Sequence, residues 1–284
     1  MDMKLAIGSP VVTSAPPGSW EDDASIEELA RVAETADRLG YDHLTCAEHV
    51  ALPASELERR GSRYWDPLAT FGYLAARTER IRFATGVLVL PYHHPLDIAK
   101  RYGTLDKISN GRLILGVGVG TLKEEFDLLG APYDRRGPRA DDALRALRAA
   151  LSQPEPEYHG EFYDFEGMVV DPCAVQEHVP LWVGGRTLRS LRRAVTLADG
   201  WCPFAVAPAQ AEAWLGEFEL PAGFDVVLPP TGRLDPIAEP ARTQEILAET
   251  AAHGATIVMC GFRHRSLAEY LEHLEALAAL HAET

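Results

Sequence analysis

The chain has 284 residues, of which 46% are hydrophobic and 24% charged, so it can bury a sizeable core and is not a disordered protein. It carries 27 basic and 42 acidic residues, a formal net charge of −15. This charge argues against nucleic acid or an anionic membrane as the main partner, because both attract basic surfaces. No apolar run approaches the roughly 20 residues of a membrane span, and the first ten residues lack a signal-peptide pattern.

The cysteines give a further indication of the compartment. The four of them stand far apart and form no C-x-x-C pair: Cys46, Cys173, Cys202 and Cys260. We interpret them as reduced thiols rather than as a disulfide framework or a zinc site. We therefore expect a cytoplasmic protein.

Short apolar runs alternate with longer amphipathic ones along the whole chain. In chain order, strands are predicted at 4–9, 43–48, 81–90, 112–117, 181–183, 200–204, 224–228 and 256–260. Helices are predicted at 25–39, after Asp66-Pro67, from Pro95 to Asn110, at 138–151, at 187–198 and after Ser266. Ser25 with Glu28 and Ser266 with Glu269 have the spacing of capping boxes that begin a helix.

This alternation predicts the fold class. Eight strand–helix units in 284 residues favour an α/β fold with a parallel sheet closed into a (β/α)8 TIM barrel. No repeat, low-complexity stretch or linker interrupts the chain, so we expect a single domain over residues 1–284. Residues 153–180 interrupt the alternation of strands and helices, and the aromatic residues around Gly160 predict a short hairpin inserted before the fifth strand.

Barrel enzymes carry their reactive groups on the loops that follow the strands. Glu48 and His49 follow the second predicted strand. A histidine at this place suits acid–base catalysis, although a hydrogen-bonded structural role is equally compatible with the sequence. Trp65 and Trp201 could stack on a bound ring, but core filling is the preferred interpretation of each.

Two glycine-rich turns follow other strands. Gly116 to Gly120 reads GVGVG, but Thr121 stands where a dinucleotide fingerprint needs glycine, and close backbone packing is an equal alternative. Gly184, Gly185, Arg186 and Thr187 open a helix, where backbone N–H groups, a hydroxyl and a guanidinium suit a phosphate. A tight turn without a ligand is the alternative.

Two barrel chemistries are disfavoured. Of the four lysines only Lys4 lies on a predicted strand, at the end away from the active face, so a Schiff-base aldolase is excluded. No H-x-H stands on a strand and His93-His94 would point to opposite faces, so we expect no metal site.

Longer stretches of the chain carry a resemblance. They are YDHLTCAEH at 41–49, WDPLATFGYLAARTERIRFATGVLVLP at 65–91, PLDIAKR from Pro95, TLDKISNGRLILGVGVG at 104–120, EEF from Glu124, RGPR from Arg136, PCAVQEHVPLWVGG at 172–185 and ADGW at 198–201. Together they make the chain resemble, nearly end to end, the luciferase-like flavin and deazaflavin oxidoreductases. This superfamily of (β/α)8 barrels includes the coenzyme F420-dependent enzymes.

The resemblance implies that a flavin or deazaflavin binds at the carboxyl-terminal mouth of the barrel. A bulge in strand three, with a non-proline cis peptide at Gly86-Val87, would back the ring. His49 would be the catalytic acid–base group near the ring, next to Glu48. The remaining cofactor-binding residues implied are Gly120 and Thr121 at the cofactor's side chain and Gly184, Gly185, Arg186 and Thr187 at its phosphate.

Two departures from the family narrow the function. Thr121 stands where the sugar-phosphate dehydrogenases of this family have glutamate, so sugar-phosphate oxidation is disfavoured. The chain also lacks the long insertion that is typical of luciferases.

We therefore predict a coenzyme F420-dependent oxidoreductase that transfers a hydride between the deazaflavin and a small organic substrate, and we expect a homodimer. An FMN-dependent monooxygenase and a non-catalytic flavin-binding barrel remain alternatives. Two arginine clusters would bind the acidic tail of coenzyme F420: Arg59, Arg60 and Arg63, and Arg135, Arg136 and Arg139. The alternative interpretation of both clusters is ordinary solvated charge on loops.

Overall fold

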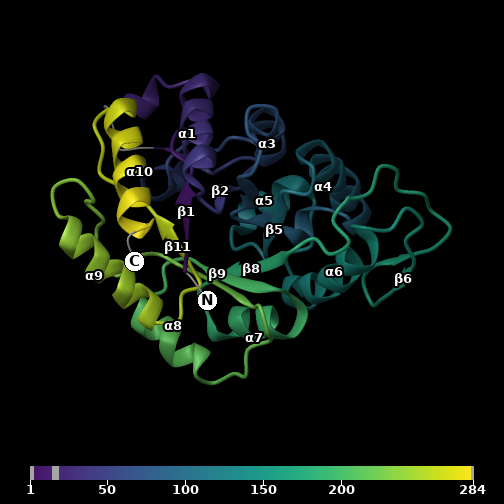
Figure 1. Cartoon of the computed structure of the whole chain (residues 1–284). Helices are drawn as coiled ribbons and strands as arrows, with labels where there is room; N and C mark the ends of the chain where they lie inside the picture. The colour runs from purple at the N-terminus through teal and green to yellow at the C-terminus, as the bar shows by residue number, and fades with distance from the viewer. Residues whose placement is uncertain (1–2, 15–18, 283–284) are drawn as a thin grey trace.

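The main sheet closes into a barrel of parallel strands surrounded by helices (Figure 1). The structure is a computed structural model that describes residues 3–14 and 19–282. Within these ranges, eight strands form the ring, and their order around it is β1 Lys4–Gly8, β2 His43–Cys46, β3 Arg82–Thr85, β5 Leu113–Gly118, β8 Leu181–Gly185, β9 Gly200–Pro203, β10 Asp225–Leu228 and β11 Ile257–Cys260. β11 pairs with β1 and closes the ring, which confirms the predicted (β/α)8 barrel.

Helices cover the outside of the ring (Figure 1). The longer ones are α1 Ile26–Leu39, α3 Pro67–Ala75, α4 Pro95–Ser109, α6 Arg136–Ala150, α7 Leu188–Leu197, α8 Pro208–Leu215, α9 Pro240–Ala252 and α10 Leu267–Ala282. Short helical segments in the loops are η1 Trp20–Asp22, η2 Ala54–Glu56, α2 Leu57–Arg60, η3 Leu90–Tyr92 and α5 Lys123–Leu129. Among the described residues no helix is both long and apolar enough to cross a membrane.

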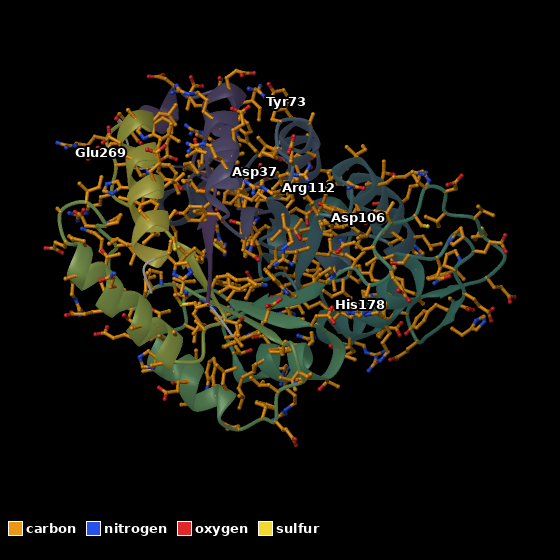
Figure 2. All side chains as sticks on the ribbon, viewed as in Figure 1. Asp37, Tyr73, Asp106, Arg112, His178 and Glu269 are labelled. Carbon is orange, nitrogen blue, oxygen red and sulfur yellow. The ribbon has the colours of Figure 1, made fainter. Side chains whose placement is uncertain are left out.

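The two predicted capping boxes differ in outcome. At α1 the box is complete between Ser25 and Glu28, and Gly40 ends the helix at φ 81°. At α10 only half of it forms: Ser266 Oγ accepts from the backbone N–H of Glu269, labelled in Figure 2, at 3.2 Å. The Glu269 carboxylate instead accepts from the backbone N–H of Arg265, because the Arg265 guanidinium forms an ion pair with it.

The third predicted strand, at 81–90, is divided into two pieces. β3 pairs with β2 and β5 inside the ring, while β4 Leu88–Val89 pairs with β5 alone and lies outside the ring. The Gly86-Val87 peptide between them is cis, as the resemblance implied. The prediction of one continuous strand is wrong because this turn takes the chain out of the ring.

Close backbone packing explains the glycines of the GVGVG stretch, which begins within β5. A Cβ on Gly116 would lie 2.1 Å from the Thr85 carbonyl oxygen, and one on Gly118 would lie 2.8 Å from Val87 Cγ2. A Cβ on Gly184, which lies on the neighbouring strand β8, would be 2.6 Å from Val87 Cγ1. These glycines are therefore required because β3, β5, β8 and the Gly86-Val87 turn approach one another too closely for side chains.

Residues 153–180 form the predicted insertion. β6 Tyr158–His159 and β7 Asp164–Phe165 make a small antiparallel hairpin, which projects from the side opposite α10 (Figure 1). The buried carboxylate of Asp106, labelled in Figure 2, ties the end of the insertion to α4. It accepts from the backbone N–H groups of Val175 at 2.9 Å and Gln176 at 3.0 Å.

The tryptophans considered as ring-stacking candidates differ in burial. Trp201 is fully buried, and its indole N–H donates to Ser190 Oγ at 3.1 Å. Core filling is therefore the correct interpretation of Trp201. Trp65 is partly buried and packs against the main core.

Candidate active site

Since every strand of the ring runs in the same direction, the residues that follow the strands share one rim of the barrel. His49 lies on this rim, after β2, with its side chain 18% exposed. Its ring packs edge-on against Tyr64 with the centroids 4.6 Å apart. His49 Nδ1 lies 2.9 Å from Glu125 Oε2. No described residue is hydrogen-bonded to Nε2, so this nitrogen is available to a ligand.

Glu125, on the short helix α5, is the residue that the sequence analysis missed. Its side chain is completely buried, and its Oε1 accepts from the backbone N–H groups of Val50 at 2.6 Å and Ala51 at 3.3 Å. Burial alone would raise the pKa of Glu125, but the hydrogen bonds from His49 and these N–H groups lower it. Glu125 is therefore a carboxylate, and the proton of the His49–Glu125 contact lies on Nδ1.

Tyr92 completes this group of hydrogen bonds. Its hydroxyl donates to Glu125 Oε2 at 3.0 Å. Burial and the neighbouring Glu125 raise the pKa of Tyr92, so the phenol remains protonated and remains a donor. His49 and Tyr92 thus share one carboxylate oxygen.

Glu48 lies beside His49 but faces the protein. Its Oε2 accepts from the backbone N–H of Val89 at 2.7 Å, and its Oε1 lies 2.7 Å from His93 Nε2. Its backbone N–H donates to the Val87 carbonyl. Glu48 therefore holds the segment around the cis peptide in place.

The cis turn itself lies at the rim. Gly86 is exposed and Val87 half-buried, and the Val87 methyl groups lie against Gly118 and Gly184. The structure thus presents a small apolar surface above the barrel interior, next to the strand that carries His49.

The Gly184–Thr187 turn lies at the amino-terminal end of α7. Arg186 and Thr187 are both exposed, and no described residue bonds to either side chain. The Thr187 hydroxyl does not cap the helix. Gly185 has a φ of 137°, and a Cβ on it would meet Ser190 Cβ at 2.6 Å. The turn therefore requires glycine for its own geometry, while the hydroxyl and the guanidinium beside it are unengaged.

Gly120 and Thr121 lie at the end of β5. The Gly120 carbonyl accepts from Arg136 Nε at 3.2 Å, and Thr121 is exposed. Arg136 also lies over the Tyr133 ring at 3.9 Å. The guanidinium of Arg136 is thus used to fix the loop after β5.

The other arginines proposed to receive an acidic tail also have partners. Arg59 and Arg60 both pair with Glu56, and Arg63 pairs with Asp22 at 3.0 Å. Arg135 pairs with Glu161 at 2.6 Å, and Arg139 lies over the Phe162 ring at 4.6 Å. Carboxylates thus neutralise Arg59, Arg60, Arg63 and Arg135, which favours loop charge as the interpretation of these four, whereas Arg136 and Arg139 lie against aromatic rings.

Known proteins share this architecture and sequence pattern. Residues 3–219 match the model of the luciferase-like monooxygenase family. An uncharacterised protein of Mycobacterium tuberculosis is 33% identical over 265 residues, which cover 88% of this chain and 92% of that protein. The oxygenase component of a flavin-dependent trigonelline monooxygenase from Acinetobacter baylyi is 28% identical over 200 residues, 68% of this chain and 52% of that protein.

A solved structure supports the fold independently. The coenzyme F420-dependent tetrahydromethanopterin reductase of Methanopyrus kandleri superposes with a TM-score of 0.73 over 98% of both chains, at 17% identity. The chain belongs to the luciferase-like family, whose members include monooxygenases and other oxidoreductases. The resemblance stated from the sequence is thereby confirmed.

Proposed function

We propose that the protein is a coenzyme F420-dependent oxidoreductase that transfers a hydride between the deazaflavin and a small organic substrate. The observation that carries the proposal is the His49–Glu125 pair, which leaves one imidazole nitrogen free at the barrel rim. Hydride transfer to a carbonyl or imine carbon needs a proton donor beside it and the reverse transfer needs a proton acceptor, and the free Nε2 of an imidazole can serve in either role.

The residues at the rim fit a flavin-type cofactor. The bound ring would supply the hydride chemistry, and Gly86 and Val87 would support it from the barrel side. Thr187, Arg186 and the first backbone N–H groups of α7 would hold the phosphate. Glu48 would keep the cis turn in position through Val89 and His93. His49 would hold or release a proton at Nε2, while Glu125 keeps the Nδ1 proton in place.

The TGVLVLP stretch at 85–91, which resembles deazaflavin members of the family, supports coenzyme F420 over FMN. Chain length does not distinguish the two cofactors, because the chain covers 98% of the F420-dependent reductase and 99% of the oxygenating constituent of a Baeyer–Villiger monooxygenase that binds FMN. The second candidate is an FMN-dependent monooxygenase. It is favoured by the ion pairs of Arg59, Arg60, Arg63 and Arg135, because arginines that already have carboxylate partners attract the acidic tail of coenzyme F420 less strongly.

The test is an equilibrium titration of the purified protein with coenzyme F420 and, separately, with FMN, followed by cofactor fluorescence. We expect tighter binding of coenzyme F420 and reduction or oxidation of the bound deazaflavin when a substrate is supplied. Tight FMN binding without detectable binding of coenzyme F420 would overturn the proposal in favour of the monooxygenase. Binding of either cofactor without turnover on any tested carbonyl or imine compound would favour a non-catalytic barrel.

A further inference from the structure

A polar pocket on the same rim is lined by neither His49 nor the Gly184–Thr187 turn. It has a volume of about 230 Å³ and lies among the loops that follow β10 and β11. Six residues line it: Arg233, Leu234, Asp235, Glu239, Arg263 and His273. In the ring, β11 is separated from the His49 strand β2 only by β1, so the pocket lies beside the candidate active site.

The two arginines of this pocket are unpaired. Arg233 and Arg263 are exposed, and across residues 3–14 and 19–282 no carboxylate or carbonyl is bonded to either guanidinium. Arg265, two residues beyond Arg263, is by contrast paired with Glu269 at 3.2 Å. In a chain with 42 acidic residues, two guanidinium groups that line one cavity without a partner indicate that they meet an anion from outside.

A buried histidine that lines the same pocket is the second observation. His273, on α10, is only 6% exposed, and its Nδ1 has no hydrogen-bond partner among the described residues. Its ring is stacked on Phe262 with the centroids 5.3 Å apart and the planes at 6°. A buried polar atom without a partner is costly, so the histidine that lines this cavity has a hydrogen-bonding group that the described residues leave unsatisfied.

The acidic residues of the pocket form no ion pair with its arginines. Asp235 Oδ1 accepts from the backbone N–H of Ala238 at 2.9 Å, and the Asp235 N–H donates to Thr243 Oγ1. Asp235 is thus engaged in the turn that leads into α9. Glu239 is exposed and immediately precedes that helix.

We propose that this pocket binds the phosphate or carboxylate group of a ligand, through Arg233, Arg263 and His273. A cavity of about 230 Å³ is smaller than the sites of whole drug-sized ligands, so one acidic group fits it better than a complete cofactor. The group belongs either to the substrate or to the tail of coenzyme F420. The assignment of the group to the tail of coenzyme F420 rests on the proposed function, whereas the binding of an acidic group by the pocket does not.

The first experiment uses inorganic phosphate as the probe and cofactor-free protein. Isothermal titration is done in an Arg186→Gln background, so that the turn before α7 does not contribute. We expect the Arg233→Gln/Arg263→Gln double variant to bind phosphate about tenfold more weakly or worse. His273→Phe, which keeps the ring stack on Phe262 and removes the nitrogens, should also weaken binding. Arg265→Gln is the matched control, and its affinity should remain within about twofold.

Two results would overturn the proposal: no saturable phosphate binding in the parent protein, or equal weakening by Arg265→Gln. Circular dichroism and thermal unfolding establish that each variant is folded. Because this titration contains no cofactor, a lack of phosphate binding would not contradict the proposed function. Conversely, if neither coenzyme F420 nor FMN bound, the phosphate result would still be valid.

The second experiment identifies the source of the acidic group. Coenzyme F420 and FMN are titrated into the protein with and without the Arg233→Gln/Arg263→Gln changes. Loss of affinity for coenzyme F420 alone supports the pocket with the acidic tail as its occupant. Unchanged affinity for both cofactors, together with lost phosphate binding, supports the pocket with a substrate group as its occupant. Equal loss for both cofactors would mean that the substitutions distort the barrel mouth, and would overturn the pocket.

Discussion

His49 and Glu125, 76 residues apart in the chain, meet at the barrel rim with Nδ1 and Oε2 2.9 Å from each other. Glu125 is buried and its pKa is lowered, so its carboxylate accepts a hydrogen bond from the Nδ1–H of His49 and fixes the tautomer of the ring. This arrangement, a carboxylate that orients a histidine, lets the opposite nitrogen act as acid or base.

Replacing His49 by alanine should abolish most of the turnover while the fold and cofactor affinity persist. General acid–base catalysis is worth roughly 10²–10⁴ in rate, so kcat with a true substrate should fall by that range. The measurement is steady-state kinetics together with a cofactor titration of the variant. A loss of less than about threefold, far short of that range, would assign His49 a structural role.

Glu125→Gln should lower kcat by about tenfold or more, because the amide no longer stabilises the proton on His49 Nδ1. Since Glu125 acts through His49, the variant should also shift the pH dependence of kcat, which a merely structural role would not do. Glu124→Gln is the matched control, since Glu124 is the exposed neighbour on the same helix. An unchanged pH profile in Glu125→Gln would contradict the positioning role.

If the proposed phosphate site is correct, Arg186→Gln should weaken cofactor binding and reduce the dependence of that binding on salt, because one positive charge that would face the phosphate is removed. Arg186 is a better test than Gly185, since a side chain on Gly185 would collide with Ser190 and disturb the turn itself. Arg192→Gln, an exposed position further along α7, serves as the control. Equal salt dependence in both variants would place the phosphate elsewhere.

Gly116→Ala should destabilise the barrel by about 1–3 kcal/mol, because the new Cβ would lie 2.1 Å from the Thr85 carbonyl oxygen. Gly72→Ala provides the opposite case. Gly72 lies within α3, and a Cβ there meets nothing within 4 Å, so alanine should stabilise by about 0.5–1 kcal/mol. Denaturant unfolding of both variants measures the difference, and a neutral Gly116→Ala would show that β3 and β5 can separate freely.

Asp142→Asn should loosen the hairpin insertion at neutral pH. Asp142 accepts from the Tyr158 hydroxyl at 2.5 Å and from the backbone N–H of Phe162 at 2.7 Å. Burial raises the pKa of Asp142, but these hydrogen bonds lower it more, below the ordinary value of 3.8. A lowered pKa in the folded state means that the carboxylate stabilises above pH 3.8 and that this contribution is lost as pH falls through the folded pKa.

The measurement for Asp142→Asn is hydrogen exchange and denaturant unfolding at pH 7 and at about pH 3. The stability difference between the parent and the variant should be largest at pH 7 and should shrink in acid. A difference that is independent of pH would show that the Asp142 charge does not hold the hairpin.

The sequence by itself determined the class of the fold, one helix cap and the place of the hairpin insertion. Alternation of buried strands with amphipathic helices depends on local periodicity, so it predicted the barrel, the α1 cap at Ser25 and the hairpin around Gly160. The cis peptide at Gly86-Val87 and the positions of His49 and the Gly184–Thr187 turn came from the resemblance and from their places after strands.

Only the tertiary structure decided which polar groups meet. Glu125 reads as one of several acidic residues on a short helix, and only folding brings it from α5 to the strand that carries His49. Most of the arginines that stand close together in the sequence proved to be paired with carboxylates, whereas Arg233 and Arg263, 30 positions apart by their numbers, line one pocket unpaired. The physical reason is that hydrogen bonds and ion pairs across a barrel depend on strand order and loop packing, which local sequence periodicity does not encode.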